Sequence, residues 1–197
     1  MIHSTALTSV SVWLSKPLLL GIIALLMALS CQPGRADTIY ETQDDFLKEV
    51  FPNKIAGEDI KPAVLWLDKK AQDDIGKILG HPYPQARLRY WRKNDTSVWI
   101  LDEVGKEYPI TAGFVIREEK IIRAQVLIYR ETRGMEIHLP SFLSQFKDNK
   151  LEGDKLTNKV DGIAGATMSV NAMVKMAQVS LILNKQASLM LNNKAQP

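Results

Sequence analysis

Four strand-like segments separated by very short gaps dominate the middle of this chain of 197 residues. Between Gln85 and Ile137, the segments ARLRYW, SVWILDEV, ITAGFVIR and KIIRAQVLIYR are rich in β-branched and aromatic residues. The turn-prone stretches RKND, GKEYP and EE separate them. Gaps this short join antiparallel neighbours, because a parallel pair needs a crossover of about a dozen residues. We therefore predict an antiparallel sheet.

Helical patterns precede and follow the predicted sheet. The first predicted helix begins with a capping-box-like pattern at Thr42 and ends at Pro52. The second predicted helix ends at Gly80. No repeat and no Pro/Gly-rich linker divides the chain after its first residues. The fold class predicted is one α+β domain, an antiparallel sheet flanked by helices. The segments with helical periodicity are residues 42–52, 67–81, 140–149 and 169–190.

The start of the chain is typical of an export signal. Lys16 precedes the apolar run Pro17–Leu29, whose length suits a signal peptide and is short for a membrane span. The small residues Gly34 and Ala36 have the spacing expected for cleavage after residue 36. We therefore predict a periplasmic protein.

Two alternatives to this cleavage stay open. The signal could end at residue 30, with Cys31 acylated as in a lipoprotein, or the N-terminus could remain as an uncleaved membrane anchor. Cys31 is the only cysteine, so disulfide frameworks, CxxC redox pairs and CxxCH haem attachment are excluded. Any redox chemistry would therefore need an organic cofactor.

The charge balance argues against nucleic acid as a partner. The whole chain has 25 Lys and Arg against 22 Asp and Glu. Lys16 and Arg35 are the only charged residues before Asp37. The chain from Asp37 onward therefore has 23 Lys and Arg against 22 Asp and Glu, a net charge of +1. A value so close to neutral lacks the basic character of nucleic-acid-binding domains.

The loop DGIAGAT, residues 161–167, combines an acid, two glycines and a threonine at the start of the last predicted helix. A helix N-terminus presents unpaired N–H groups and a partial positive charge, which suit a phosphate. Small residues in front of it give a bulky ligand access to the hydroxyl. The alternative is a tight turn that only leads the chain into the helix.

This loop resembles the Dxx(S/T)GAT signature of the FMN-binding domain family, which includes the C subunit of the sodium-pumping NADH:quinone reductase and the G subunit of the Rnf complex. In that family the motif threonine carries FMN through a phosphoester bond, installed by a flavin transferase that uses FAD and Mg²⁺. The resemblance makes Thr167 the flavin-bearing residue, Asp161 the motif acid, and Gly165 and Ala166 the small pair. Ala164 replaces the usual Ser or Thr.

A second segment, YRETRGMEI, is similar to the family's ETPG segment, which lies against the flavin. Glu131, Thr132 and Gly134 match it, and Arg133 replaces the proline. FLSQFKDNKL and ITAGFVI also resemble family segments, so that the similarity covers roughly residues 85–185. The predicted organisation is a signal segment, an N-terminal helical segment and an FMN-binding domain: residues 1–36, 37–84 and 85–190.

The resemblance implies an exported electron-transfer flavoprotein, with FMN on Thr167, that relays electrons between a membrane reductase and periplasmic acceptors such as cytochromes. No convergent acid/base set and no metal-ligand spacing occurs, so we assign no catalytic residue and no metal ligand. An electron carrier is therefore favoured over a stand-alone enzyme. The alternatives are a flavin-dependent reductase of a small substrate and a module that binds FMN or a partner without a covalent bond.

Overall fold

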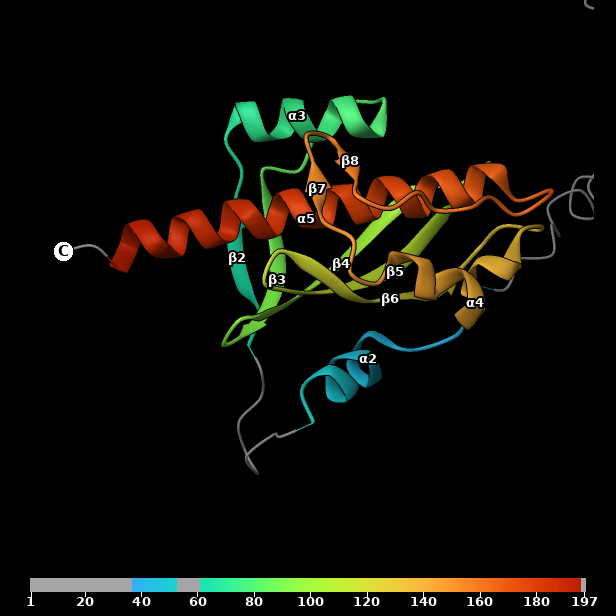
Figure 1. Cartoon of the computed structure of the whole chain (residues 1–197), viewed down its shortest axis with the longest axis horizontal. Helices are drawn as coiled ribbons and strands as arrows, with labels where there is room; N and C mark the ends of the chain where they lie inside the picture. Colours follow the sequence, from blue (N-terminus) through green and yellow to red (C-terminus); the bar gives the residue numbers. More distant parts are fainter. Residues whose placement is uncertain (1–36, 53–60, 196–197) are drawn as a thin grey trace, which may run out of the picture. The chain divides into compact units, whose positions relative to one another are not determined.

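A six-stranded antiparallel sheet forms the centre of the computed structural model, which describes residues 37–52 and 61–195 (Figure 1). The spatial order of the strands is β1-β6-β5-β4-β3-β2. Together with the helices around it, this sheet confirms the predicted α+β class. The predicted leader lies outside the described residues. The strands are β1 (Thr38–Ile39), β2 (Ala63–Trp66), β3 (Arg87–Lys93), β4 (Thr96–Val104), β5 (Pro109–Arg117) and β6 (Lys120–Tyr129).

The four strands predicted from the sequence are β3 to β6, each paired with its neighbour in the chain. β4 and β5 pair without interruption from Thr96 opposite Arg117 to Val104 opposite Pro109. At the β5–β6 turn, Glu118 and Glu119 both have positive φ angles, of 50° and 62°. Two such residues twist a two-residue turn in the same sense as the strands that it joins. The short gaps therefore produce the antiparallel pairing that they predicted.

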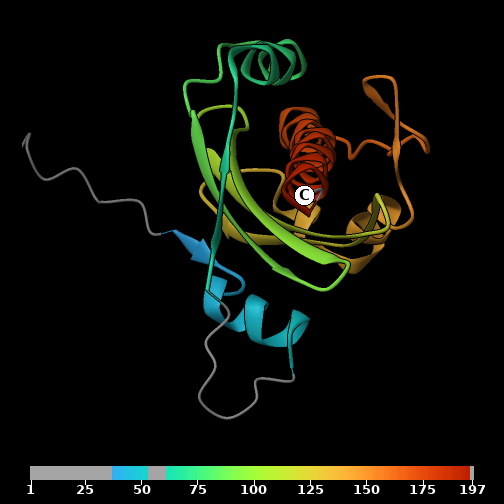
Figure 2. The same cartoon turned by 90° about the vertical axis from the view of Figure 1, so that its left-hand side faces the viewer.

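Helices cover both faces of the sheet. The long helix α5 (Thr167–Ala195) lies on one face, where Met173 belongs to the main core with Trp99 and Phe114. On the other face α2 (Gln43–Val50) buries Phe46 in a smaller apolar cluster. Figure 2 shows the two helices on opposite sides of the sheet. This two-sided cover explains why β5 is buried along nearly its whole length.

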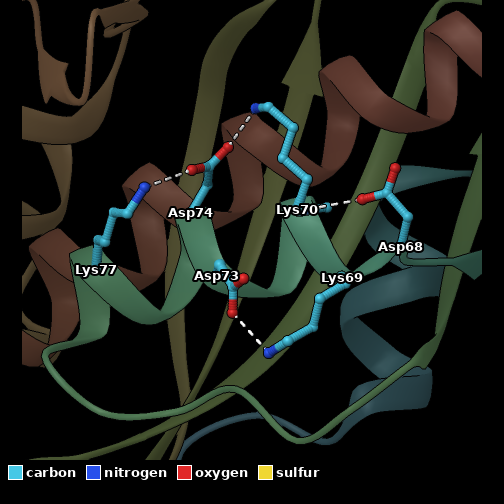
Figure 3. A network of polar contacts seen from close by, with 7 residues as sticks. Asp68, Lys69, Lys70, Asp73, Asp74 and Lys77 are labelled. Carbon is cyan, nitrogen blue, oxygen red and sulfur yellow. Dashed lines mark hydrogen bonds and ion pairs between the residues drawn. The ribbon is translucent and has the colours of Figure 1, made fainter.

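The helices before the sheet begin and end at the residues that the sequence indicates. The Thr42 side chain accepts a hydrogen bond from the N–H of Asp45 and caps α2. Gly80 ends α3 (Lys69–Leu79) in a left-handed conformation. Lysine–aspartate pairs lie along α3: Lys69–Asp73 on one side of the helix, and Lys70–Asp74 and Lys77–Asp74 on another (Figure 3).

The structure differs from the sequence prediction in its shorter elements. β1 and β2 lie in a segment that was expected to hold helices only, and both extend the sheet. Strands of two and four residues are too short to show an alternating pattern. The predicted helix over residues 140–149 is α4 (Pro140–Leu143) followed by one 3-10 turn, and a small hairpin comes next. The hairpin strands are β7 (Leu151–Glu152) and β8 (Lys155–Leu156).

Gly113 provides a test of the contact between α2 and the sheet. A Cβ atom at this position would lie 2.4 Å from Cε1 of Phe46, whose side chain is fully buried. We expect Gly113→Ala to lower the free energy of unfolding by about 1–3 kcal/mol, because the ring must move within a filled cluster. Urea denaturation measures this loss.

Two further variants control the Gly113 experiment. Gly162→Ala is the matched control, because its added methyl group meets no atom within 4 Å. Gly113→Ala combined with Phe46→Leu should recover part of the loss, since the smaller side chain makes room. An undiminished stability of Gly113→Ala would contradict the packing described.

Candidate functional site

The first turn of α5 presents free backbone donors. The first helical hydrogen bond runs from the N–H of Val170 to the carbonyl of Ala166. No hydrogen bond among the described residues engages the N–H groups of residues 167–169, and the first turn contains no acidic side chain. These groups and the helix dipole favour an anion at this end of α5.

The side chains of this turn alternate between solvent and core. Thr167 is exposed and Met168 is 51% exposed, whereas Ala166 and Ser169 are buried. The turn is therefore anchored by two small buried residues while the Thr167 side chain faces outward. A second molecule can reach a hydroxyl group placed in this way.

The segment after β6 packs directly on this turn. Gly134 has a φ of 86°, and a Cβ atom there would lie 2.9 Å from Cβ of Ala166 and 3.1 Å from Oγ of Ser169. Any side chain at position 134 would push the two segments apart. The structure thus brings together the two stretches that resemble FMN-binding segments, at one end of α5 (Figure 1).

Tyr129, the last residue of β6, ties these two segments together. Its hydroxyl group donates to the carbonyl oxygen of Arg133 and lies 3.0 Å from Oγ of Ser169. Burial raises the pKa of the Tyr129 phenol above its ordinary value of 10. The phenol therefore keeps the proton that it donates over the whole neutral range. No local sequence pattern indicates this role of Tyr129.

Glu131 holds a third segment, the turn between β4 and β5. The carboxylate is 8% exposed, and its Oε1 accepts the N–H groups of Lys106, Glu107 and Tyr108 at 2.5, 2.6 and 2.9 Å. A Cβ atom on Gly105 would lie 2.8 Å from the same oxygen. Glu131, which lies just after the end of β6, therefore fixes the backbone of the β4–β5 turn.

These segments surround a pocket of about 460 Å³, a size within the range of small-ligand sites. Five of the seven predicted cofactor residues line it: Glu131, Thr132, Gly165, Ala166 and Thr167. Gly134 lies behind them as a packing residue. The N–H of Asp161 donates to Oε1 of Gln145 at 2.7 Å, and Asp161 does not line the pocket. The other lining residues are Lys106, Arg133, Met168 and Ser169.

The comparison with protein families assigns this region. Residues 105–181 match the family model described as the FMN-binding domain. This chain carries an FMN-binding domain. It is therefore a flavin-binding protein, and its cofactor is FMN. The match contains every residue that lines the pocket, from Lys106 to Ser169. No curated protein matches the chain.

The pocket residues fit a flavin phosphate. Free N–H groups at the start of α5, the exposed Thr167 hydroxyl group and the cations Lys106 and Arg133 suit a phosphate group. Within residues 37–52 and 61–195, no cluster of three or more histidine, cysteine or acidic side chains is arranged to bind a metal ion. No helix in the same ranges is long and apolar enough to span a membrane.

Replacement of Tyr129 tests the connection between the two FMN-binding segments. We expect Tyr129→Phe to lower the free energy of unfolding by about 1 kcal/mol at pH 8, because the Arg133 carbonyl loses its donor. The phenol pKa is raised in the folded state, so this contribution is complete below pH 10 and declines as the pH rises through the folded-state pKa. Urea denaturation at pH 8, 10 and 11 should therefore show the two proteins converging.

Tyr90→Phe is the matched control for this experiment. Tyr90 is also buried and stacks on Trp99, with ring centroids 4.6 Å apart, a contact that phenylalanine retains. The described residues show no hydrogen bond from its hydroxyl group. If Tyr90→Phe and Tyr129→Phe lose the same stability at pH 8, the Tyr129 hydrogen bonds contribute nothing specific.

Proposed function

We propose that FMN is attached covalently to Thr167 through a phosphoester bond and that the protein is an electron carrier. The observation that carries this proposal is the exposed Thr167 side chain at the wall of a pocket inside the FMN-binding domain. Bound FMN supplies one- and two-electron chemistry, and the protein supplies its position and electrostatic surroundings.

Thr167 acts as an acceptor in the attachment. A threonine hydroxyl group is a weak nucleophile on its own, so a separate flavin transferase activates it. The Thr167 oxygen forms the new bond to the FMN phosphorus of FAD, the diphosphate P–O bond breaks, AMP leaves, and the hydroxyl proton passes to the transferase. FAD and Mg²⁺ belong to that enzyme, as the family resemblance implies.

The residues around the pocket favour an electron carrier over a reductase of a small substrate. Among its lining residues the only carboxylate is that of Glu131, and its Oε1 already accepts three backbone N–H groups. A reductase that protonates its substrate needs a general acid at the site, and Lys106 is the one ionisable lining side chain besides Arg133 that is left for this role. Electron transfer between cofactors needs no such group.

We infer a periplasmic location from the leader-like residues 1–36, with the lipoprotein at Cys31 or an N-terminal anchor as alternatives. A covalent bond suits an exported protein, because no cytoplasmic FMN pool can replace a cofactor that dissociates. The partners proposed are a flavin transferase for maturation and a membrane-bound reductase or cytochrome for electron exchange.

Mass spectrometry of the protein co-expressed with a flavin transferase tests the attachment. We expect one FMN phosphoester on the peptide that contains Thr167, and no adduct in Thr167→Ala. Thr132→Ala is the matched control, since Thr132 lines the same pocket, and it should retain the adduct. Flavin that is released from the wild-type protein on denaturation would favour the non-covalent alternative instead.

A further inference from the structure

We propose that Lys106 and Arg133 recognise the phosphate group of the flavin nucleotide, and that Glu131 and Tyr129 position them for this role. The inference rests on the proposed function and assigns residues to the phosphate end of the cofactor. Both cations line the pocket with Thr167, although they are far apart in the sequence.

Two buried residues at and just after the end of β6, Tyr129 and Glu131, hold the backbone of the two cationic residues. Glu131 accepts the N–H of Lys106, and Tyr129 donates to the carbonyl of Arg133. Tyr129 is 2% exposed and Glu131 is 8% exposed, so that neither anchor is free to move through solvent. The exposed side chains of Lys106 and Arg133 therefore start from backbone positions that these hydrogen bonds hold at the pocket wall.

The charges of the pocket favour an anion. The nearest ion-pair partner described for Lys106 is Glu107, with Nζ and Oε1 3.9 Å apart at an exposed position, where such a pair contributes little. The described residues show no ion pair for Arg133. The two cations outnumber the single carboxylate of the lining, and the free N–H groups of the first α5 turn add to the positive potential. A phosphate group neutralises this potential.

Arg133 adds the second cation to the pocket. The segment that it belongs to resembles an ETPG segment, in which the corresponding residue is proline and carries no charge. Arginine adds a planar donor that binds phosphate oxygens in pairs. The replacement therefore adds a group able to bind phosphate to the pocket that Thr167 also lines.

A second lysine-rich hollow, of about 500 Å³, lies between α3, α5 and the β7–β8 hairpin. Lys70 and Lys77 both pair with Asp74, at 2.7 and 3.0 Å (Figure 3). Glu119 and Asp154 add further negative charge. With Lys150 and Lys185 counted, its lining has four lysines against three acids, the same net charge of +1 as the Thr167 pocket. It contains neither Thr167 nor the first turn of α5, so its lysines provide a control that is matched in charge.

The test compares FMN with riboflavin, which has the same ring system and no phosphate group. The full-length protein is expressed without a flavin transferase, and each ligand is titrated in low salt by fluorescence quenching. We expect FMN to bind about tenfold more tightly than riboflavin, a difference of about 1.4 kcal/mol. The double variant K106Q/R133Q should lose this preference while its riboflavin affinity stays unchanged. Arg133→Lys should retain part of it.

The double variant K70Q/K77Q removes the same number of charges from the α3 hollow and should bind FMN as the wild type does. All four substituted side chains lie on the surface, so thermal unfolding should show intact folds. No measurable FMN binding, equal wild-type affinities for the two ligands, or unchanged FMN binding by K106Q/R133Q would each overturn the inference. None of these results affects the Thr167 adduct, whose absence would instead reject the proposed function.

Discussion

The close contact between the first turn of α5 and the segment after β6 is the constraint on which the site depends. It requires glycine at position 134, because any Cβ atom would enter the space of Ala166 and Ser169. Tyr129 then bridges the two segments through its hydroxyl group. One small residue and one buried phenol therefore set the spacing between the helix that bears Thr167 and the opposite wall of the pocket.

The sheet also fixes the position of the β4–β5 turn, the third segment that lines the pocket. β6 is paired along its length with β5, and the residue at its end, Tyr129, faces the α5 side of the sheet. Glu131 follows two residues later and reaches the turn before β5. A single strand end therefore organises loops that come from three parts of the chain. Sites supported by buried side chains in this way hold their groups more exactly than isolated loops do.

The sequence predicts the regular parts of this structure better than the contacts that shape the site. The four long strands, the stop at Gly80 and the helix after Thr167 all follow from local patterns. The resemblance brings Glu131 and Gly134 into the prediction, but the reasons for both residues are long-range. Nothing near Glu131 in the sequence indicates that its carboxylate accepts N–H groups 23 to 25 residues earlier in the chain. Lys106 was missed for the same reason.

Rigidity and exposure are combined at Thr167, and the proposed function needs both. A transferase must reach the hydroxyl group, which requires an exposed residue and small neighbours. An electron carrier must hold its cofactor in a fixed position, because electron transfer depends on the distance and orientation of the ring. The alternation of exposed Thr167 and Met168 with buried Ala166 and Ser169 meets both demands within one helical turn. A covalent bond formed at such a turn inherits the rigidity of α5, the longest helix of the domain.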